Sequence, residues 1–360
     1  MTRMTNIIQT LWYNRETFHP LNPLPFIALC LSYLFCCGVD VRNKLFDLGI
    51  SEQHKLPCPV ISVGNIAVGG TGKTPTVILI ARMLNEKGMR PAVLSRGYGG
   101  SAETPINIVS DGERILMNPV EAGDEPVLMA KALPGIPVLT GANRYDTGFY
   151  AIKNMGTNVL VLDDGFQHRN LHRDVNIVLL DTNRPFGNGY MLPRGPLRES
   201  AKALRRADIV IRMGIPCRAD EALSPIPFSG PLFNGYHQPK DVIQAGSGVM
   251  YPVDFLRNKK ICAFTGIGIP ESFKSTLKSL NVRIEAFMAY PDHYRYKEQD
   301  LDDIRKTALR SSAELIITTE KDAIKLSEYH HFCDNLFVLR TEIRITEGPD
   351  ALMQGIKMRI

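Results

Sequence analysis

The stretch that decides the fold of this 360-residue chain is Val60-Ile61-Ser62-Val63-Gly64-Asn65-Ile66-Ala67-Val68-Gly69-Gly70-Thr71-Gly72-Lys73-Thr74-Pro75. It begins with a short apolar run, residues 60–63, which predicts a buried strand. The glycines that follow predict a loop. From Thr76 to Lys87 the apolar residues recur with helical spacing and stop at Gly88, a residue favoured just after a helix. A strand, a glycine-rich loop and a helix in this order are typical of phosphate-binding loops.

The loop itself, Gly69-Gly70-Thr71-Gly72-Lys73-Thr74, has the residue types that bind a nucleotide. Glycines let backbone N–H groups curl around phosphate oxygens, a lysine reaches the terminal phosphates, and a threonine hydroxyl is an oxygen ligand for Mg²⁺. The strict pattern has glycine where this chain has Ala67, so the match is imperfect. The alternative is a glycine turn with a surface lysine. The strand and the helix on either side favour nucleotide binding.

Short apolar runs alternate with helical segments through the rest of the chain. Strands are expected at residues 92–95, 136–139, 159–162, 175–180, 260–264, 282–288, 315–318 and 336–339, and helices at 271–280 and 299–309. Runs that are apolar on both faces indicate a mainly parallel sheet with helices on both sides. The sequence therefore predicts an α/β fold of the P-loop NTPase type, with a second, smaller α/β domain and an N-terminal apolar helix.

A passage rich in proline and glycine, residues 225–239, is the expected connection between two domains. The resulting division has an N-terminal segment, a nucleotide-binding core, a linker and a smaller C-terminal α/β domain. These are expected over residues 1–56, 57–224, 225–250 and 251–360.

Composition limits the class of protein. Lysine and arginine number 42 against 37 aspartates and glutamates, a net charge of +5, and 44% of the residues are hydrophobic. This balance is typical of a globular protein and excludes a disordered, collagen-like or polytopic membrane chain. No run of five basic residues occurs, so a nucleic-acid partner is not expected. The seven cysteines contain no C-x-x-C pair, which favours a reducing compartment, and nothing indicates an obligate protein partner.

One apolar run, Leu24 to Val39, stands apart. Its sixteen residues would form a helix of about 24 Å, shorter than the ~30 Å hydrocarbon core of a bilayer. A secretory signal and a buried core helix are the alternatives, but no small-residue cleavage site follows the run. We expect a helix that is capped by Asn22, has Pro23 at its first position, and lies in or dips into a membrane face. Charged residues from Asp40 onward would return the chain to water.

A second chemical signal is the acid pair Asp163-Asp164, directly after the apolar run 159–162. P-loop enzymes present a carboxylate associated with Mg²⁺ at the end of a strand in this way. The same acids would also suit the cap of a turn, because Gly165 follows them. With the phosphate loop in the same chain, the metal interpretation is favoured.

Three polar clusters are candidates for chemistry at a phosphoryl acceptor. They are Gly123-Asp124-Glu125-Pro126, Gln167-His168-Arg169 and Pro291-Asp292-His293. Each alone would suit a turn or a solvated cap, but all three lie beside expected strands or helices, where α/β sites form. An aspartate is a weak base at pH 7, so a histidine partner or partial burial would help it. The residues themselves leave the choice among the clusters open.

Together, the ordered motifs resemble the tetraacyldisaccharide 4'-kinase family of the lipid A pathway in Gram-negative bacteria. The motifs are Gly64-Asn65 with residues 69–75, Ser95-Arg96-Gly97-Tyr98-Gly99, residues 123–126, residues 163–168, residues 184–189 leading to Gly195-Pro196-Leu197-Arg198-Glu199, and Thr319-Glu320-Lys321-Asp322. The resemblance covers nearly the whole chain. Phosphate loops of this family generally lack the first glycine, in agreement with Ala67.

The resemblance implies transfer of the γ-phosphate of ATP to the 4'-hydroxyl of a lipid-linked glucosamine disaccharide 1-phosphate, giving lipid IVA, at the cytoplasmic face of the inner membrane. By similarity, Asp124 is the expected base and His293 its partner across the interdomain cleft. The residues expected around Mg²⁺ are Thr74, Asp163, Asp164 and Glu199. Those expected to bind the acceptor or its phosphate are Glu125, Arg144, Gln167, His168 and Arg198.

This chain departs from the family pattern in three places. Tyr290 and Tyr294 stand where phenylalanine and a second histidine are common, Ser200 stands where proline is common, and only Arg42 and Lys44 follow the apolar run instead of a dense basic patch. The rival interpretation is a P-loop regulatory or metal-delivery NTPase that acts as a switch. A guanine-specific switch would have an N/T-K-x-D stretch, whereas residues 319–322 have their lysine one place too late.

Overall fold

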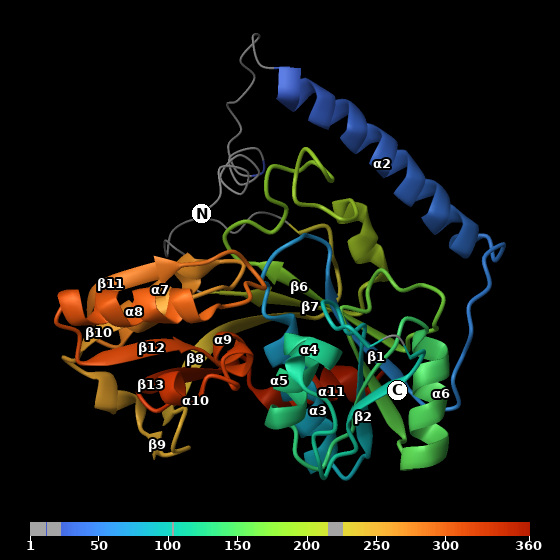
Figure 1. The fold of residues 1–360 in the computed structure, drawn as a ribbon. Helices are drawn as coiled ribbons and strands as arrows, with labels where there is room; N and C mark the ends of the chain where they lie inside the picture. The colour runs from blue at the N-terminus through green and yellow to red at the C-terminus, as the bar shows by residue number, and fades with distance from the viewer. Residues whose placement is uncertain (1–11, 13–22, 103, 215–225) are drawn as a thin grey trace.

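The computed structural model describes residue 12 and residues 23–102, 104–214 and 226–360. Within these residues a sheet of thirteen strands runs through the molecule, with helices on both faces (Figure 1). The strands are β1 (Val60–Asn65), β2 (Pro91–Ser95), β3 (Asn107–Ser110), β4 (Val138–Thr140), β5 (Val159–Asp163), β6 (Val175–Asp181), β7 (Ile209–Met213), β8 (Leu232–Gln244), β9 (Met250–Tyr251), β10 (Lys260–Thr265), β11 (Arg283–Ala289), β12 (Leu315–Thr319) and β13 (Leu336–Ile345). Their order across the sheet is β11-β10-β12-β13-β8-β7-β6-β1-β5-β2-β4-β3, and β9 pairs with β8.

The N-terminal half of the sheet, β1 to β7, contains the phosphate loop. Strands β7, β6, β1, β5, β2 and β4 are parallel to their neighbours, and β3 adds an antiparallel edge. On one face pack α3 (Lys73–Glu86), α5 (Asp124–Ala132) and α11 (Pro349–Lys357), and on the other packs α6 (Arg144–Met155). This double cover is why the strands are apolar on both faces. The predicted α/β fold with a mainly parallel sheet is confirmed.

The C-terminal half, β10 to β13, is built in the same way on a smaller scale. Strands β11, β10, β12 and β13 are parallel. One face is covered by α7 (Pro270–Ser279), and the other by α8 (Glu298–Arg310) and α10 (His330–Cys333). Between β12 and α10 lies α9 (Glu320–Lys325). The remaining short helices are α4 (Pro119–Ala122), η1 (Ala201–Arg206) and η2 (Val253–Leu256).

Half of the segment expected to be a linker is a strand. Of residues 225–250, Leu232–Gln244 form the 13-residue strand β8, which pairs in parallel with β7 and antiparallel with β13. The two halves are therefore joined by continuous sheet, while the domain boundaries themselves stay a prediction. The strand includes Pro239, which lies where the register between β8 and β13 shifts, a position at which a ladder accepts proline.

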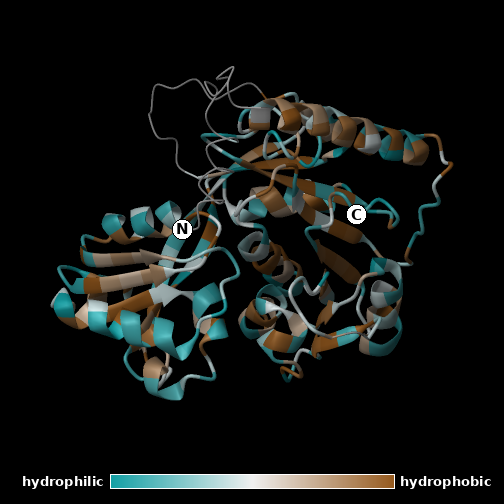
Figure 2. Cartoon of the chain, turned by 45° about the horizontal axis from the view of Figure 1, so that its top comes forward, coloured by the Kyte–Doolittle hydropathy of each residue, from teal (hydrophilic) through white to brown (hydrophobic). Residues whose placement is uncertain are grey.

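The N-terminal helix α2 (Pro23–Asp47) runs along the outside of the molecule (Figure 1). Its 25 residues make it about 37 Å long, well beyond the expected end at Val39. From Leu24 to Asp47 it is long and apolar enough to cross a membrane by length and composition, and most of this helix has the colour of hydrophobic residues in Figure 2. Asn22, the expected cap, lies outside the described residues.

One stripe of α2 contacts the protein, and the rest is exposed. Ala28 and Ser32 are buried, and Ser32 Oγ donates to the Met191 carbonyl oxygen at 2.7 Å. From the sequence, the charged end of α2 is expected to return the chain to water. Instead, Arg42 contacts the protein and donates to the Gln167 carbonyl oxygen at 3.0 Å. The exposed apolar face of α2 consists of Leu24, Phe26, Ile27, Leu31, Tyr33, Leu34, Phe35 and Val41.

Candidate active site

The phosphate loop connects the end of β1 to the start of α3. Gly72 caps α3 with a φ of 80°, and a Cβ there would lie 3.0 Å from His237 Nε2. Only glycine suits both the left-handed backbone and this close approach. Because no side chain caps α3, its first backbone N–H groups point to a site for phosphate oxygens. Asn65 Nδ2 donates to Thr71 Oγ1 at 3.0 Å and fixes the loop to its strand.

The first acid of the pair, Asp163, ends β5 beside the phosphate loop. The register pairs it with Val63 of β1. Asp163 is 3% exposed, and its Oδ2 accepts a hydrogen bond of 3.2 Å from Ser95 Oγ. Burial, followed by the nearby charges of Glu125 and Asp164, raises the pKa of Asp163 to about 7. A bound cation would favour the ionised form of this carboxyl.

The second acid, Asp164, is surrounded by cations. Its backbone has a φ of 50°, a left-handed conformation that is unfavourable for a residue with a Cβ. Its Oδ1 lies 3.8 Å from Lys73 Nζ, and its Oδ2 accepts a hydrogen bond of 2.7 Å from Arg198 Nη1. Burial opposes ionisation, but Lys73 and Arg198 hold the pKa of Asp164 below its ordinary value. This carboxylate is therefore negatively charged beside the phosphate loop.

The acid pair has oxygen atoms that fit a divalent cation. Asp163 Oδ1 and Asp164 Oδ1 are buried and accept no hydrogen bond from any described residue, although buried polar atoms normally have a partner. Thr74, at the start of α3, is 8% exposed. Mg²⁺ is commonly held by one or two such oxygen ligands together with substrate phosphates. Among the described residues, no group of three or more His, Cys, Asp or Glu side chains has the geometry of a metal site.

Glu199, the other acid expected near Mg²⁺, has protein partners. It is 1% exposed, and its Oε2 accepts hydrogen bonds from Arg206 Nη2 at 2.5 Å and from Asn43 Nδ2 at 2.9 Å. Asn43 belongs to α2, so this carboxylate ties the N-terminal helix to the segment after β6. Its second oxygen, Oε1, is buried and has no hydrogen-bond partner in the part of the chain that the structure describes.

Asp124 and His293 meet across the two halves of the sheet. Asp124 opens α5, whereas His293 follows β11, and Asp124 Oδ2 lies 3.2 Å from His293 Nδ1. His293 has a φ of 56°, and its ring meets the Tyr98 ring edge-on with 6.1 Å between centroids. The structure thus brings into contact the two residues that the sequence analysis expected as base and partner.

Two lysines of α9, which the sequence analysis missed, also reach this pair. Lys325 Nζ lies 3.7 Å from Asp124 Oδ2 and 3.3 Å from Asp322 Oδ1. Lys321 Nζ lies 3.2 Å from His293 Nε2. The signal that would have found them is their spacing of four residues on a helix that begins in the motif at 319–322.

Electrostatics keep Asp124 ionised. Its partial burial would raise the pKa, but the hydrogen bond to His293 and the positive charges of Lys325 and Lys321 hold the pKa below its ordinary value. The carboxylate therefore carries a negative charge at neutral pH and can accept a proton.

The loop after β10 brings these groups close to the phosphate loop. A Cβ built on Gly268 would lie 3.2 Å from Asp292 Oδ2 and 3.7 Å from the backbone nitrogen of Gly70. Gly268 therefore lies between the phosphate loop and Asp292, the residue before His293. A side chain at Gly268 would fill this narrow space.

The residues expected at the acceptor lie around the same site. Gln167 Nε2 donates to the Asn65 carbonyl oxygen at 2.9 Å, and Arg198 is paired with Asp164. Arg144 is 4% exposed, and burial lowers its pKa to about 10. Burial, then the charge of Arg144, lowers the pKa of His168 to about 4, so this imidazole is neutral at pH 7. Glu125, the last of the five residues expected at the acceptor, contacts Lys321.

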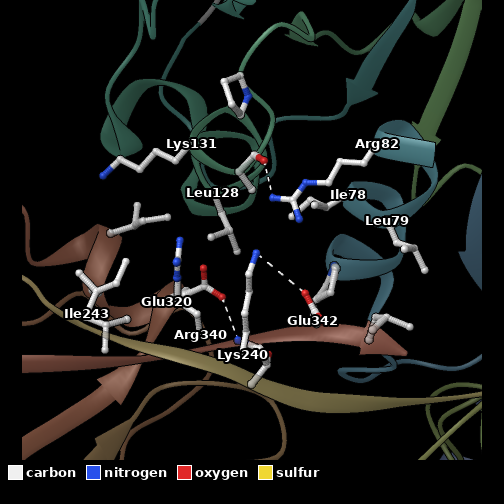
Figure 3. Close-up of a pocket in the computed structure, with 18 of the residues that line it drawn as sticks. Ile78, Leu79, Arg82, Leu128, Lys131, Lys240, Ile243, Glu320, Arg340 and Glu342 are labelled. Atoms are coloured by element: carbon white, nitrogen blue, oxygen red, sulfur yellow. Dashed lines mark hydrogen bonds and ion pairs between the residues drawn. The ribbon is translucent and has the colours of Figure 1, made fainter. Parts of the chain in front are cut away.

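A cavity of about 1090 Å³ lies between helices of the two halves beside this site. Figure 3 shows α3 and α5 on one side, with Ile78 and Leu128, and α9 on the other, with Glu320. The same three helices carry Lys73, Asp124 and Lys321 near their N-terminal ends. These three side chains are thus held by helices from both halves.

A phosphate cradle that faces a carboxylate–imidazole pair defines a P-loop phosphotransferase, because transfer to a hydroxyl group needs both a bound phosphate and a base. The family model described as LpxK, Tetraacyldisaccharide-1-P 4'-kinase, matches residues 24–360. This chain belongs to that family, as the resemblance of its motifs implied.

Similar proteins and a solved structure agree with this family assignment. The chain is 49% identical over 348 residues to the tetraacyldisaccharide 4'-kinase of Syntrophus aciditrophicus (strain SB), a match that covers 93% of each chain. It is 41% identical over 339 residues to that of Pelobacter propionicus, covering 94% of this chain and 93% of the relative. A crystal structure of LpxK from Aquifex aeolicus in complex with ATP has a TM-score of 0.76 at 35% identity, covering 93% of this chain and 99% of that one.

Proposed function

We propose that this chain transfers the γ-phosphate of ATP to the 4'-hydroxyl of a tetraacylated glucosamine disaccharide 1-phosphate, forming lipid IVA in lipid A biosynthesis. The observation that carries the proposal is the contact of 3.2 Å between Asp124 and His293 beside the phosphate loop. An NTPase switch without a chemical acceptor, the rival interpretation, has no use for such a base.

The phosphate loop binds ATP in this proposal. The backbone N–H groups of residues 69–74 contact the phosphates, and Lys73 pairs with the terminal ones. The buried Oδ1 atoms of Asp163 and Asp164, which accept no hydrogen bond from the described residues, would hold Mg²⁺ together with the Thr74 hydroxyl. Glu199 would add negative charge through its second oxygen, Oε1. When bound, Mg²⁺ supplies positive charge that neutralises the phosphate oxygens.

Asp124 then acts on the acceptor. Its ionised carboxylate takes the proton of the 4'-hydroxyl as that oxygen attacks the γ-phosphorus, and ADP leaves with the electrons of the broken P–O bond. His293 orients Asp124. Glu125, Arg144, Gln167, His168 and Arg198 bind the acceptor and its phosphate.

The acceptor is acylated, so the protein works at a membrane. The exposed apolar face of α2 supports attachment to the cytoplasmic face of the bacterial inner membrane, where the loop would meet ATP. The membrane surface and the lipid-linked disaccharide are the partners in this proposal.

A direct assay tests it. The purified protein is incubated with Mg²⁺, γ-³²P-labelled ATP and the tetraacylated disaccharide 1-phosphate, and label in the lipid fraction is measured. We expect lipid labelling by the wild type and none by Lys73→Ala. ATP hydrolysis without lipid labelling would contradict the proposal and favour the switch.

A further inference from the structure

Lys321 lies between the two halves of the sheet and uses all of its donors there. Its Nζ is 3.1 Å from Glu125 Oε1, 3.2 Å from Asp292 Oδ1 and 3.2 Å from His293 Nε2, and its side chain is 17% exposed. An ammonium group has three protons and no lone pair. Three acceptors therefore occupy it fully, and it has no donor left for a phosphate of the nucleotide.

Lys321 stays positively charged at neutral pH. Burial by itself would lower its pKa, but Glu125 and Asp292 more than offset this effect and raise the pKa above its ordinary value. The group therefore stays an ammonium ion across the neutral range and acts only as a hydrogen-bond donor.

The ammonium group of Lys321, which can only donate, lies 3.2 Å from His293 Nε2 and determines whether that nitrogen carries a hydrogen. Nε2 has to accept, so it carries no hydrogen, and the hydrogen of the neutral ring lies on Nδ1. Nδ1 then donates to Asp124 Oδ2 at 3.2 Å. In the opposite tautomer, an N–H at Nε2 would face the ammonium group, and an unprotonated Nδ1 would face a carboxylate. Both contacts would be repulsive.

The other groups that face the ring do not change this assignment. Asp292 Oδ2 is 3.8 Å from Nε2, beyond hydrogen-bond distance, and the Tyr98 ring meets the imidazole edge-on. Lys325 approaches Asp124 rather than the ring. Lys321 is thus the described group within hydrogen-bond distance that fixes the state of Nε2.

The start of α9 holds Lys321 in place. Thr319 caps this helix by accepting a hydrogen bond of 3.2 Å from the Asp322 backbone nitrogen. Asp322 is fully buried and accepts hydrogen bonds of 2.8 Å from Thr265 Oγ1 and 3.0 Å from Tyr296 Oη. The residue that follows Lys321 is therefore fixed to the end of β10 and to the segment before α8.

We propose that Lys321 is a positioning residue that selects the tautomer of His293 with its hydrogen on Nδ1, so that the imidazole donates to Asp124 and leaves Asp124 Oδ1 for the acceptor hydroxyl. The part that concerns the hydroxyl rests on the proposed function, whereas the tautomer does not. A cation of one half thus orients a base of the other through the histidine.

The tautomer is tested by ¹⁵N NMR of the full chain labelled at histidine, without ATP or acceptor. The His293→Gln variant assigns the His293 signals by their loss. We expect an unprotonated Nε2 and a protonated Nδ1 in the wild type. A protonated Nε2 in the wild type would overturn the proposal without any further variant.

Substitutions then identify Lys321 as the cause. In Lys321→Met we expect the His293 signals to move toward the other tautomer, with kcat at least about tenfold lower and the KM for ATP kept. Lys321→Arg, which also only donates, should restore both. Lys325→Met should keep the tautomer, and Lys306→Met on α8, whose side chain is 64% exposed, should keep both tautomer and kcat.

Two results would contradict the role of Lys321. One is an unchanged His293 spectrum in a folded Lys321→Met variant, with folding checked by its thermal unfolding transition. The other is a lowered kcat that Lys321→Arg fails to restore. If the tautomer is as expected but an Asp124→Asn variant keeps full turnover, the assignment of the base is wrong while the tautomer stands.

Discussion

The carboxylate of Asp124 and the imidazole of His293 lie 3.2 Å apart, although 169 positions separate them in the chain. One belongs to a helix over the N-terminal half of the sheet and the other to a loop of the C-terminal half. These two residues therefore meet only when the two halves are packed together as they are here.

Replacing Asp124 by asparagine should slow phosphoryl transfer without weakening ATP binding. Asparagine keeps the shape of aspartate but cannot take a proton, and a general base contributes about 10²–10⁴-fold to a rate. We expect kcat to fall by that factor and the KM for ATP to stay within about twofold. Steady-state kinetics check this. Turnover close to the wild type would assign the base to another acid, Glu125 or Asp292.

Replacing Lys325 by methionine should move the acid limb of the pH–rate profile to higher pH. The cation stabilises the charged form of Asp124, whose pKa is held below its ordinary value. Without it, burial is less opposed, so the pKa of Asp124 rises and the base is protonated at a higher pH. We expect a shift of about one pH unit. The profile of kcat against pH measures it, and a limb that stays in place would show that Asp124 is not the titrating group.

Replacing Asp322 by alanine should destabilise the C-terminal half strongly. This fully buried carboxylate accepts from Tyr296 and Thr265 and pairs with Lys325. Removing one partner of a buried ion pair costs about 3–5 kcal/mol. Urea unfolding should show this loss. Asp302→Ala on α8, where the side chain is 60% exposed, is the control and should change the free energy of unfolding by less than about 0.5 kcal/mol.

Charges on the exposed face of α2 should release the protein from membranes. Leu31 and Leu34 are 48% and 69% exposed, and each would gain about 1.5–3 kcal/mol when buried in lipid, roughly tenfold or more in partitioning. We expect the double variant Leu31→Glu, Leu34→Glu to bind phosphatidylethanolamine–phosphatidylglycerol vesicles about 100-fold less. Co-sedimentation measures this binding.

Leu48→Glu is the matched control for that experiment. Leu48 is 73% exposed but lies past the end of α2. We expect its vesicle binding to match the wild type. Equal losses in the control and in the double variant would show that net charge, and not the face of α2, governs attachment.

Much of the fold was predictable from local sequence. The strand before the phosphate loop, the loop glycines and the helix after them each have a local signal, because a buried strand is apolar and a left-handed backbone position needs glycine. The strand β8 was not predictable in this way. Proline and glycine normally end regular structure, and only pairing with β7 and β13 makes Leu232–Gln244 a strand.

The same division holds for the site. The sequence by itself determined the phosphate cradle and the acid pair, because each is a run of neighbouring residues whose chemistry needs no distant partner. The pairing of Asp124 with His293 was expected only from the family resemblance, because the residues themselves left the choice among the clusters open. The tertiary structure decided which lysine faces that histidine, and that Glu199 pairs with Arg206 and Asn43. Those contacts join residues far apart in the chain, and a hydrogen bond is specified by distance in space, which only the packing of the two halves and α2 supplies.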